Sequence, residues 1–209
     1  MKIAVFGATG KTGRHIVEQA LAAGHHVVAF ARKPGKLSLA DERLSIVQGD
    51  VQRAEQVEQA IQGVDAVVSV LGPSHNKPTY EVSRGTTNIL EAMHKHNVRR
   101  LVVSAGAGIG DPNDAPKLPN KAINLALKLL SRNVYEDMIC TAQIIRASDR
   151  DWVIVRVPRL TDNPKTGNVK VAWVGKGMGY QIPRADMAAW MLKQIDDPTY
   201  VRQAPAISI

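Results

Sequence analysis

Gly7, Gly10 and Gly13 recur at every third position near the N-terminus, a spacing that lets a phosphate group approach bare backbone. An apolar run at 3–6 precedes them, and helical periodicity begins by Ile16. Gly7 permits a tight turn, Gly10 removes a side chain that would block phosphates, and Gly13 lets a helix pack on its strand. The pattern predicts a strand, turn and helix that bind the pyrophosphate of a dinucleotide. The alternative is a glycine-rich turn without a ligand.

Arg32 and Lys33 follow the second apolar run, at 26–31. Proteins that prefer the unphosphorylated dinucleotide usually place an acidic residue here, which accepts a hydrogen bond from the ribose 2′-hydroxyl. A guanidinium instead presents a planar fork to a 2′-phosphate, and a lysine adds a point charge. The two residues therefore favour NADP(H), with NAD still possible. The alternative is a solvated basic loop.

Asp50 follows the third apolar run, at 44–48. Its carboxylate can accept from an adenine amino group while Val51 packs against the ring, or it can cap the helix expected from residue 53. Both uses stay open. Gly72, which ends the fourth run, permits close approach of the backbone to a bound cofactor.

The elements that position these residues alternate along the chain. Strands are predicted at 2–6, 26–31, 44–48, 65–70, 100–104 and 152–157, and helices at 11–23, 53–61, 79–97, 121–149 with a break near 131–133, and 184–196. Apolar strands alternating with helices are typical of an α/β fold, a doubly wound and mostly parallel sheet covered on both faces. We expect one Rossmann domain over 1–209.

Two segments fall outside this alternation. Residues 106–120 contain three prolines and predict a loop beyond the fifth strand, on the side where such sheets bind ligands. Residues 161–181 contain four glycines and predict a hairpin-like segment. We expect 159–183 to form a small substrate-side extension.

The 209 residues carry a formal net charge of +8, but the basic residues fall in separate small groups and only 4% of residues are aromatic. This argues against a nucleic-acid partner. No apolar run is long enough to span a bilayer, so no membrane partner is expected. Met1-Lys2 leads directly into a strand and Cys140 is the single cysteine, which together favour the cytoplasm. The histidines lack metal-ligand spacing with Cys140, so we expect no metal site.

The chain resembles the atypical short-chain dehydrogenase/reductase superfamily, and more narrowly the NAD(P)H-binding group that contains biliverdin reductase B/flavin reductase and the NmrA-like regulators. The resemblance covers nearly the whole chain and rests on GATGKTG at 7–13, Gly49-Asp50-Val51, Leu71-Gly72, Gly85-Thr86-x-Asn88, Val103-Ser104-Ala105-Gly106, the segment 152–158 and the segment 182–188. It implies cofactor contacts from Thr9, Lys11, Thr12 and Leu71, and it places Pro158 and Leu160 near the nicotinamide.

Members of this superfamily typically use a tyrosine with a lysine four positions later, helped by a serine, and the lysine tunes the tyrosine as a general acid or base. Ser104 matches the serine region. Tyr135 lies in the corresponding helix, but Ile139 stands four positions later, so the pair is absent. Ser104 and Tyr135 remain the candidate catalytic residues, and Tyr135 is alternatively an interfacial or core tyrosine.

The resemblance implies an NADPH-dependent oxidoreductase that transfers hydride to a flavin, quinone or tetrapyrrole-like acceptor, which can take its proton from solvent. In the biliverdin reductase B-like pattern a histidine follows Pro158, whereas here Arg159 stands there and either attracts an anionic acceptor or is a solvated loop residue. The alternatives are a non-catalytic NmrA-like sensor of NADP(H) and, less favoured, a sugar-nucleotide epimerase or dehydratase. We expect a monomer or small homo-oligomer.

Overall fold

The computed structural model describes residues 1–73 and 75–209 and is built on an eight-stranded sheet with the order β3-β2-β1-β4-β5-β6-β10-β8. All neighbouring strands are parallel except β10 and β8. The doubly wound, mostly parallel fold class is therefore confirmed. The strands are β1 (Lys2–Phe6), β2 (His26–Ala31), β3 (Leu44–Gln48), β4 (Ala66–Ser69), β5 (Arg100–Gly106), β6 (Asp151–Val157), β8 (Lys170–Ala172) and β10 (Ala206–Ser208).

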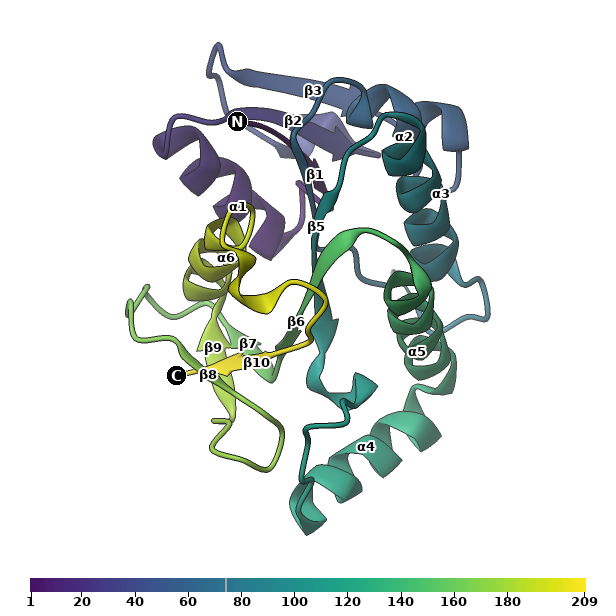
Figure 1. The fold of residues 1–209 in the computed structure, drawn as a ribbon, viewed down its shortest axis with the longest axis vertical. Coiled ribbons are helices and arrows are strands. Elements are labelled where there is room, and N and C mark those ends of the chain that lie inside the picture. Colours follow the sequence, from purple (N-terminus) through teal and green to yellow (C-terminus); the bar gives the residue numbers. More distant parts are fainter. Residues whose placement is uncertain (74) are drawn as a thin grey trace.

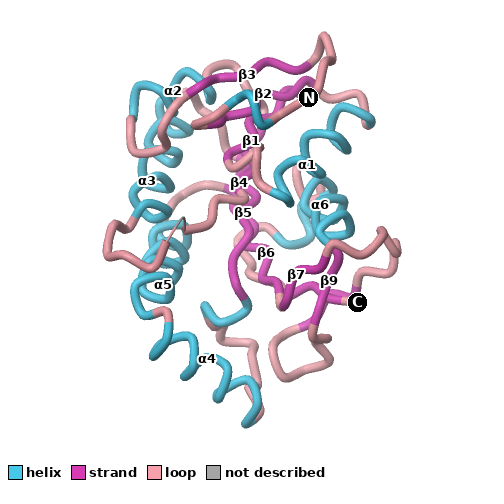
Figure 2. Tube along the Cα trace, turned by 180° about the vertical axis from the view of Figure 1, so that it is seen from behind, coloured by secondary structure: helices cyan, strands magenta, loops and turns pink. Residues whose placement is uncertain are grey.

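Helices cover both faces of this sheet. Helices α1 (Lys11–Ala22) and α6 (Arg184–Lys193) pack together on one face, and α2 (Ala54–Ile61), α3 (Glu81–Lys95) and α5 (Arg132–Ala147) form a row on the other (Figure 1). Helix α4 (Leu118–Leu130) lies beyond α5 at one end of the molecule (Figures 1 and 2). Among the described residues, no helix is long and apolar enough to cross a membrane.

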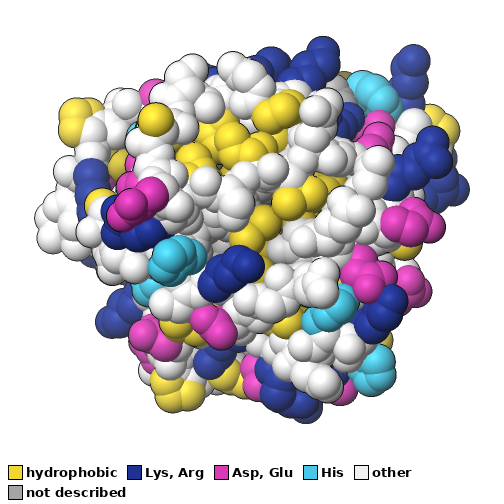
Figure 3. Space-filling model, turned by 90° about the horizontal axis from the view of Figure 1, so that it is seen from above, with side chains coloured by type: hydrophobic (Ala, Val, Ile, Leu, Met, Phe, Trp, Pro, Cys, Tyr) yellow, Lys and Arg dark blue, Asp and Glu magenta, His cyan; other side chains and the backbone are white. Residues whose placement is uncertain are grey.

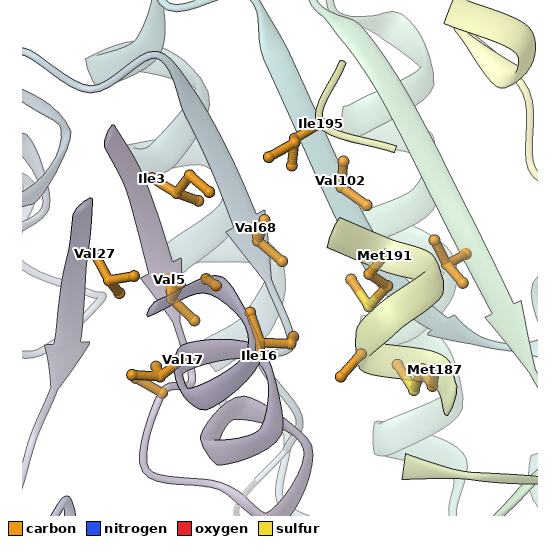
Figure 4. Close-up of a cluster of buried hydrophobic side chains, with 14 of the residues drawn as sticks. Ile3, Val5, Ile16, Val17, Val27, Val68, Val102, Met187, Met191 and Ile195 are labelled. Atoms are coloured by element: carbon orange, nitrogen blue, oxygen red, sulfur yellow. The ribbon is translucent and has the colours of Figure 1, made fainter. Parts of the chain in front are cut away.

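Two apolar cores follow from the alternation of side chains along each strand. In β1, Ile3 and Val5 point toward α1 and α6, whereas Ala4 and Phe6 point toward α2 and α3. Figure 4 shows the first core, where Ile16 of α1 and Met187 of α6 face the sheet. Because both faces are buried, the central strands contain almost only Val, Ile, Ala and Phe.

The boundaries predicted for the loop at 106–120 are wrong at both ends. Strand β5 continues to Gly106 and a short 3₁₀ helix, Ala107–Ile109, follows it. Helix α4 then begins at Leu118, with Pro119 in its first turn, where a missing backbone N–H costs no hydrogen bond. The predicted break is confirmed, because Ser131 separates α4 from α5.

The hairpin-like segment expected at 161–181 is found only in part, as an antiparallel bridge between Trp173 and Lys176. Strands β7 (Arg159–Thr161) and β9 (Gln181–Pro183) pair in parallel as a separate two-stranded sheet, and β8 joins the edge of the main sheet against β10. Three of its glycines, Gly167, Gly175 and Gly177, have positive φ values, which allow local turns. The partners of these three-residue strands come from distant sequence, which local glycine content cannot indicate.

Candidate functional site

Two neighbouring hollows follow the carboxyl ends of the parallel strands. The first, which we call the glycine hollow, has a volume of about 490 Å³, and the second, the apolar hollow, about 340 Å³. They share the wall residues Val70, Leu71, Gly72 and Val82, so they lie side by side, and we call the two together the cleft. This is the edge at which doubly wound sheets bind their ligands.

The glycine turn forms one wall of the glycine hollow. Gly7 has a φ of +81°, and a Cβ on it would lie 2.8 Å from the carbonyl oxygen of Val70. A Cβ on Gly13 would lie 2.1 Å from the carbonyl oxygen of Gly7, so the first turn of α1 packs directly on the turn. These two glycines are therefore required by the backbone itself.

Gly10 differs from its two neighbours in the motif. It is the N-cap of α1, and its N–H donates to the carbonyl of Gly7 over 3.0 Å. A Cβ here would meet only that same oxygen, at 3.2 Å, while the residue lines the hollow beside Thr9. The missing side chain at Gly10 thus opens the hollow to the N-terminus of a helix, which favours an anion.

Thr12 and Lys11, which belong to the same motif, have different surroundings. Thr12 lines the apolar hollow, whereas the Lys11 side chain is 71% exposed and its Nζ donates to Asp162 over 2.8 Å. Arg184 donates to the other oxygen of Asp162 over 2.5 Å. The hydrogen bond from Lys11 and the charge of Arg184 lower the pKa of Asp162. This ion pair ties the start of α1 to the segment that follows β7.

Cationic side chains gather at one end of the glycine hollow. Arg32, Lys33 and Lys36 all line it, and Arg14 donates to the carbonyl of Lys36 over 2.8 Å, which ties their loop to α1. Lys36 was not among the cofactor residues expected from the sequence, although its place four residues after Arg32 was a usable signal. On the face in Figure 3, Lys and Arg are interspersed with Asp and Glu.

Asp50 and Val51 line the glycine hollow opposite the glycine turn. Helix α2 begins at Ala54 with Arg53 as its N-cap, and the Asp50 carboxylate accepts from the N–H of Gln52, so the alternative of Asp50 as a helix cap is wrong. The position of Val51 is fixed by contacts with the neighbouring helix α3.

Helix α3 positions Val51 through two residues of the resemblance motif. Asn88 donates its amide to the Val51 carbonyl over 2.8 Å, and a Cβ on Gly85 would come within 2.6 Å of the Val51 side chain. Phe30, whose ring is tilted against that of Phe6 at 4.9 Å between ring centroids, completes this wall and was missed by sequence reasoning.

The apolar hollow carries few polar groups. Half-buried Ser104 of β5 lines it together with Pro158 and Leu160, while Leu71 and Gly72 form its boundary with the glycine hollow. Tyr135 is absent from the described walls of both hollows, although its neighbour Val134 is on the wall. The structure therefore brings Ser104, but not Tyr135, to the predicted nicotinamide side.

Asp137 is a wall residue that sequence reasoning missed. It is 6% exposed, and its two carboxylate oxygens accept from the backbone N–H groups of Val82 and Ser83 at 3.1 and 3.0 Å. It thus caps α3 from a different helix, a contact that no local pattern encodes.

Arg159 is exposed and lies outside the described walls of both hollows. Its backbone N–H donates to the carbonyl of Tyr180.

The cleft fits a dinucleotide phosphate. The side-chain-free turn at Gly10 faces an unencumbered helix N-terminus, and the cationic end suits a 2′-phosphate. Asp50 and Val51 offer one acceptor and one apolar contact between these two features.

Comparison with known proteins gives the same assignment. A family model described as NAD(P)H-binding matches residues 7–198. The chain is 34% identical over 126 residues to cinnamoyl-CoA reductase 1 of Oryza sativa subsp. japonica, a match covering 54% of this chain and 37% of that protein. The first curated relatives that it matches are covered over less than two thirds of their own length.

Solved structures share the fold. A short-chain dehydrogenase/reductase from Veillonella parvula in complex with NADP superposes with a TM-score of 0.84 at 18% identity, covering 100% of this chain and 94% of that one. ChuY, an anaerobillin reductase from Escherichia coli O157:H7, gives a TM-score of 0.80 at 21% identity, covering 99% and 96%.

Proposed function

We propose that this chain, which belongs to the NAD(P)H-binding family, is an NADPH-dependent reductase whose acceptor is a flavin, a quinone or a tetrapyrrole-like molecule. One observation carries the proposal. The glycine hollow, with its cationic end, adjoins an apolar hollow large enough for a planar ring system, and the two share four wall residues.

In this proposal the glycine hollow binds and orients the cofactor. The backbone of Gly7, Gly10 and Thr9 receives the pyrophosphate, Arg32 and Lys33 bind the 2′-phosphate, and Asp50 and Val51 bind the adenine. When bound, NADPH supplies a hydride from its nicotinamide. The preference for NADPH over NADH rests on the two cations.

The apolar hollow holds the acceptor. Ser104 donates its hydroxyl to a carbonyl or ring nitrogen, while Pro158 and Leu160 exclude water from one side. The acceptor takes its proton from solvent, which a conjugated ring system allows after it has gained the hydride. We propose that 159–183 is a substrate-side extension of a single domain, because Leu160 of β7 lines the apolar hollow.

The test is oxidation of NADPH against a panel of flavins, quinones and biliverdin, with a binding titration of NADPH and NADH on the same preparation. We expect NADPH to bind more tightly and at least one acceptor to give turnover. Tight binding with no turnover for any acceptor would contradict the reductase.

A second candidate is a non-catalytic sensor of NADP(H). It is favoured by Ile139, which occupies the position of the lysine that would tune Tyr135. The absence of the tyrosine–lysine pair also disfavours an epimerase or dehydratase. A sensor would show a cofactor-dependent change in a partner surface, such as altered hydrogen exchange outside the cleft, and no turnover.

A further inference from the structure

Helix α4 exposes an unusual amount of apolar surface. All thirteen of its residues are at least partly exposed. Ten large apolar side chains are exposed among the described residues, and six of them belong to α4: Leu118, Ile123, Leu125, Leu127, Leu129 and Leu130. A soluble chain rarely leaves such a patch without a partner.

Two asparagines, Asn120 and Asn124, are the half-buried residues of the helix, and every leucine in it is exposed. Asn124 faces the short 3₁₀ helix, because a Cβ on Gly108 would come within 2.6 Å of the Asn124 side-chain oxygen. Leu118, Leu125 and Leu129 are spaced seven and four residues apart, so they lie in one line on the helix. Leu118 is 82% exposed and Leu129 is 71% exposed, so this line faces away from the domain.

The charge around this apolar line has one sign. Helix α4 and its N-cap contain Lys117, Lys121 and Lys128 and no acidic residue, whereas the next basic residue, Arg132 of α5, is paired with Glu136 over 2.7 Å. On a helical projection, Lys121 and Lys128 lie about 20° apart and border the leucine line on one side. Basic residues beside an apolar face are the pattern of a helix that lies in a membrane interface.

A second copy of the chain fits this surface less well. Two α4 helices packed together would bring four lysines, Lys121 and Lys128 of each copy, close to one another with no acidic residue in either helix to offset them. A helix of 13 residues is roughly 20 Å long and 10–12 Å wide, which gives a footprint of a few hundred Å². A stable interface buries about 800 Å² on each partner.

We propose that α4 docks on a lipid bilayer that contains anionic headgroups. The helix lies parallel to the surface, with Leu118, Leu125 and Leu129 in the acyl boundary and Lys121 and Lys128 against lipid phosphates. This replaces the expectation of no membrane partner, which rested on the lack of a spanning run. A helix that lies on the surface needs no such length. The proposal does not depend on the reductase.

The experiment is flotation of the full chain with vesicles of phosphatidylcholine alone and of phosphatidylcholine mixed with phosphatidylglycerol. We expect binding only to the mixed vesicles, and release by salt. Lys121→Gln/Lys128→Gln should weaken binding roughly fivefold for each lysine removed. Leu125→Asn/Leu129→Asn should abolish it, and both leucines are exposed, so the variant should keep its circular dichroism spectrum and melting temperature.

Matched controls separate a docking helix from general stickiness. Lys170→Gln/Lys193→Gln removes the same charge from exposed sites elsewhere, and Ile46→Asn/Val171→Asn removes exposed apolar side chains from strands. Both should bind vesicles like the parent. No binding to mixed vesicles, or equal loss in the control variants, would overturn the proposal. So would a dimer in sedimentation that Leu125→Asn/Leu129→Asn dissociates, because α4 would then join two copies.

Discussion

Arg156 and Asp114 form a buried, two-pronged ion pair that joins the sheet to the segment between β5 and α4. The two guanidinium nitrogens donate to the two carboxylate oxygens at 2.7 and 2.8 Å, and Arg156 is fully buried. Arg156 also donates to the carbonyl of Ala204 and lies 5.6 Å from the ring centroid of Trp173. Asp114 accepts a further bond from the N–H of Val174. One pair thus fixes three segments beyond the cleft.

We expect Asp114→Asn to destabilise the fold by about 3–5 kcal/mol at neutral pH, because it leaves the buried guanidinium without a counter-charge. Chemical denaturation monitored by circular dichroism measures this. A loss below 1 kcal/mol would mean that the pair behaves like an exposed one.

The same pair gives a pH dependence. Burial by itself raises the pKa of Asp114, but the hydrogen bonds and charge of Arg156 outweigh it and leave the pKa lowered. A lowered pKa in the folded state stabilises the protein above the unfolded value of about 3.9 and loses this contribution as pH falls through the folded value. The stability difference between parent and Asp114→Asn should therefore shrink in acid, and a difference that grows would contradict the pair.

Arg32→Ala should reduce the preference for NADPH over NADH. Losing a charge-assisted contact with the 2′-phosphate costs on the order of 1.5–3 kcal/mol, or roughly ten- to a hundredfold in affinity for NADPH, with little change for NADH. Calorimetric titration of both nucleotides measures this. Arg159→Ala is the control, because Arg159 is exposed outside the described walls. Equal affinities in the parent would show that these cations serve another ligand.

Gly10→Val should abolish dinucleotide binding while the protein still folds, because the added side chain meets only one protein atom closely and otherwise projects into the hollow. Gly13→Val should instead lower the melting temperature sharply, since its Cβ overlaps the Gly7 carbonyl. Thermal melts with and without NADPH distinguish the two. Parental affinity in Gly10→Val would place the pyrophosphate elsewhere.

If an acceptor is found, Ser104→Ala should lower turnover by a factor of about ten to a hundred, and Tyr135→Phe should leave it within a few-fold of the parent. Ser104 lines the apolar hollow, whereas Tyr135 is absent from its described walls and lacks a lysine partner. Steady-state kinetics with matched cofactor titrations check both. A collapse of turnover in Tyr135→Phe with cofactor binding intact would restore a tyrosine-driven mechanism.

The sequence alone determined the glycine turn and the six parallel strands β1 to β6. Strands β1, β2 and β3 have the predicted boundaries, because buried parallel strands are continuous apolar runs that local composition reveals. The glycine turn was equally predictable from the sequence, since its geometry depends on residues at most six positions apart. The roles given to Ser104 and Tyr135 stay predictions.

Only the tertiary structure decided the contacts between distant segments. Asp137 caps α3 from 54 residues away, Arg156 meets Asp114 across 42 residues, and β10 joins the sheet after the last helix. Pairings of this kind depend on which surfaces meet after the chain collapses, so no local periodicity records them. The orientation of α4 could not be predicted for the same reason. Its pattern predicts an amphipathic helix, but the side that faces the protein is shown by a tertiary contact, the approach of the Asn124 side chain to Gly108.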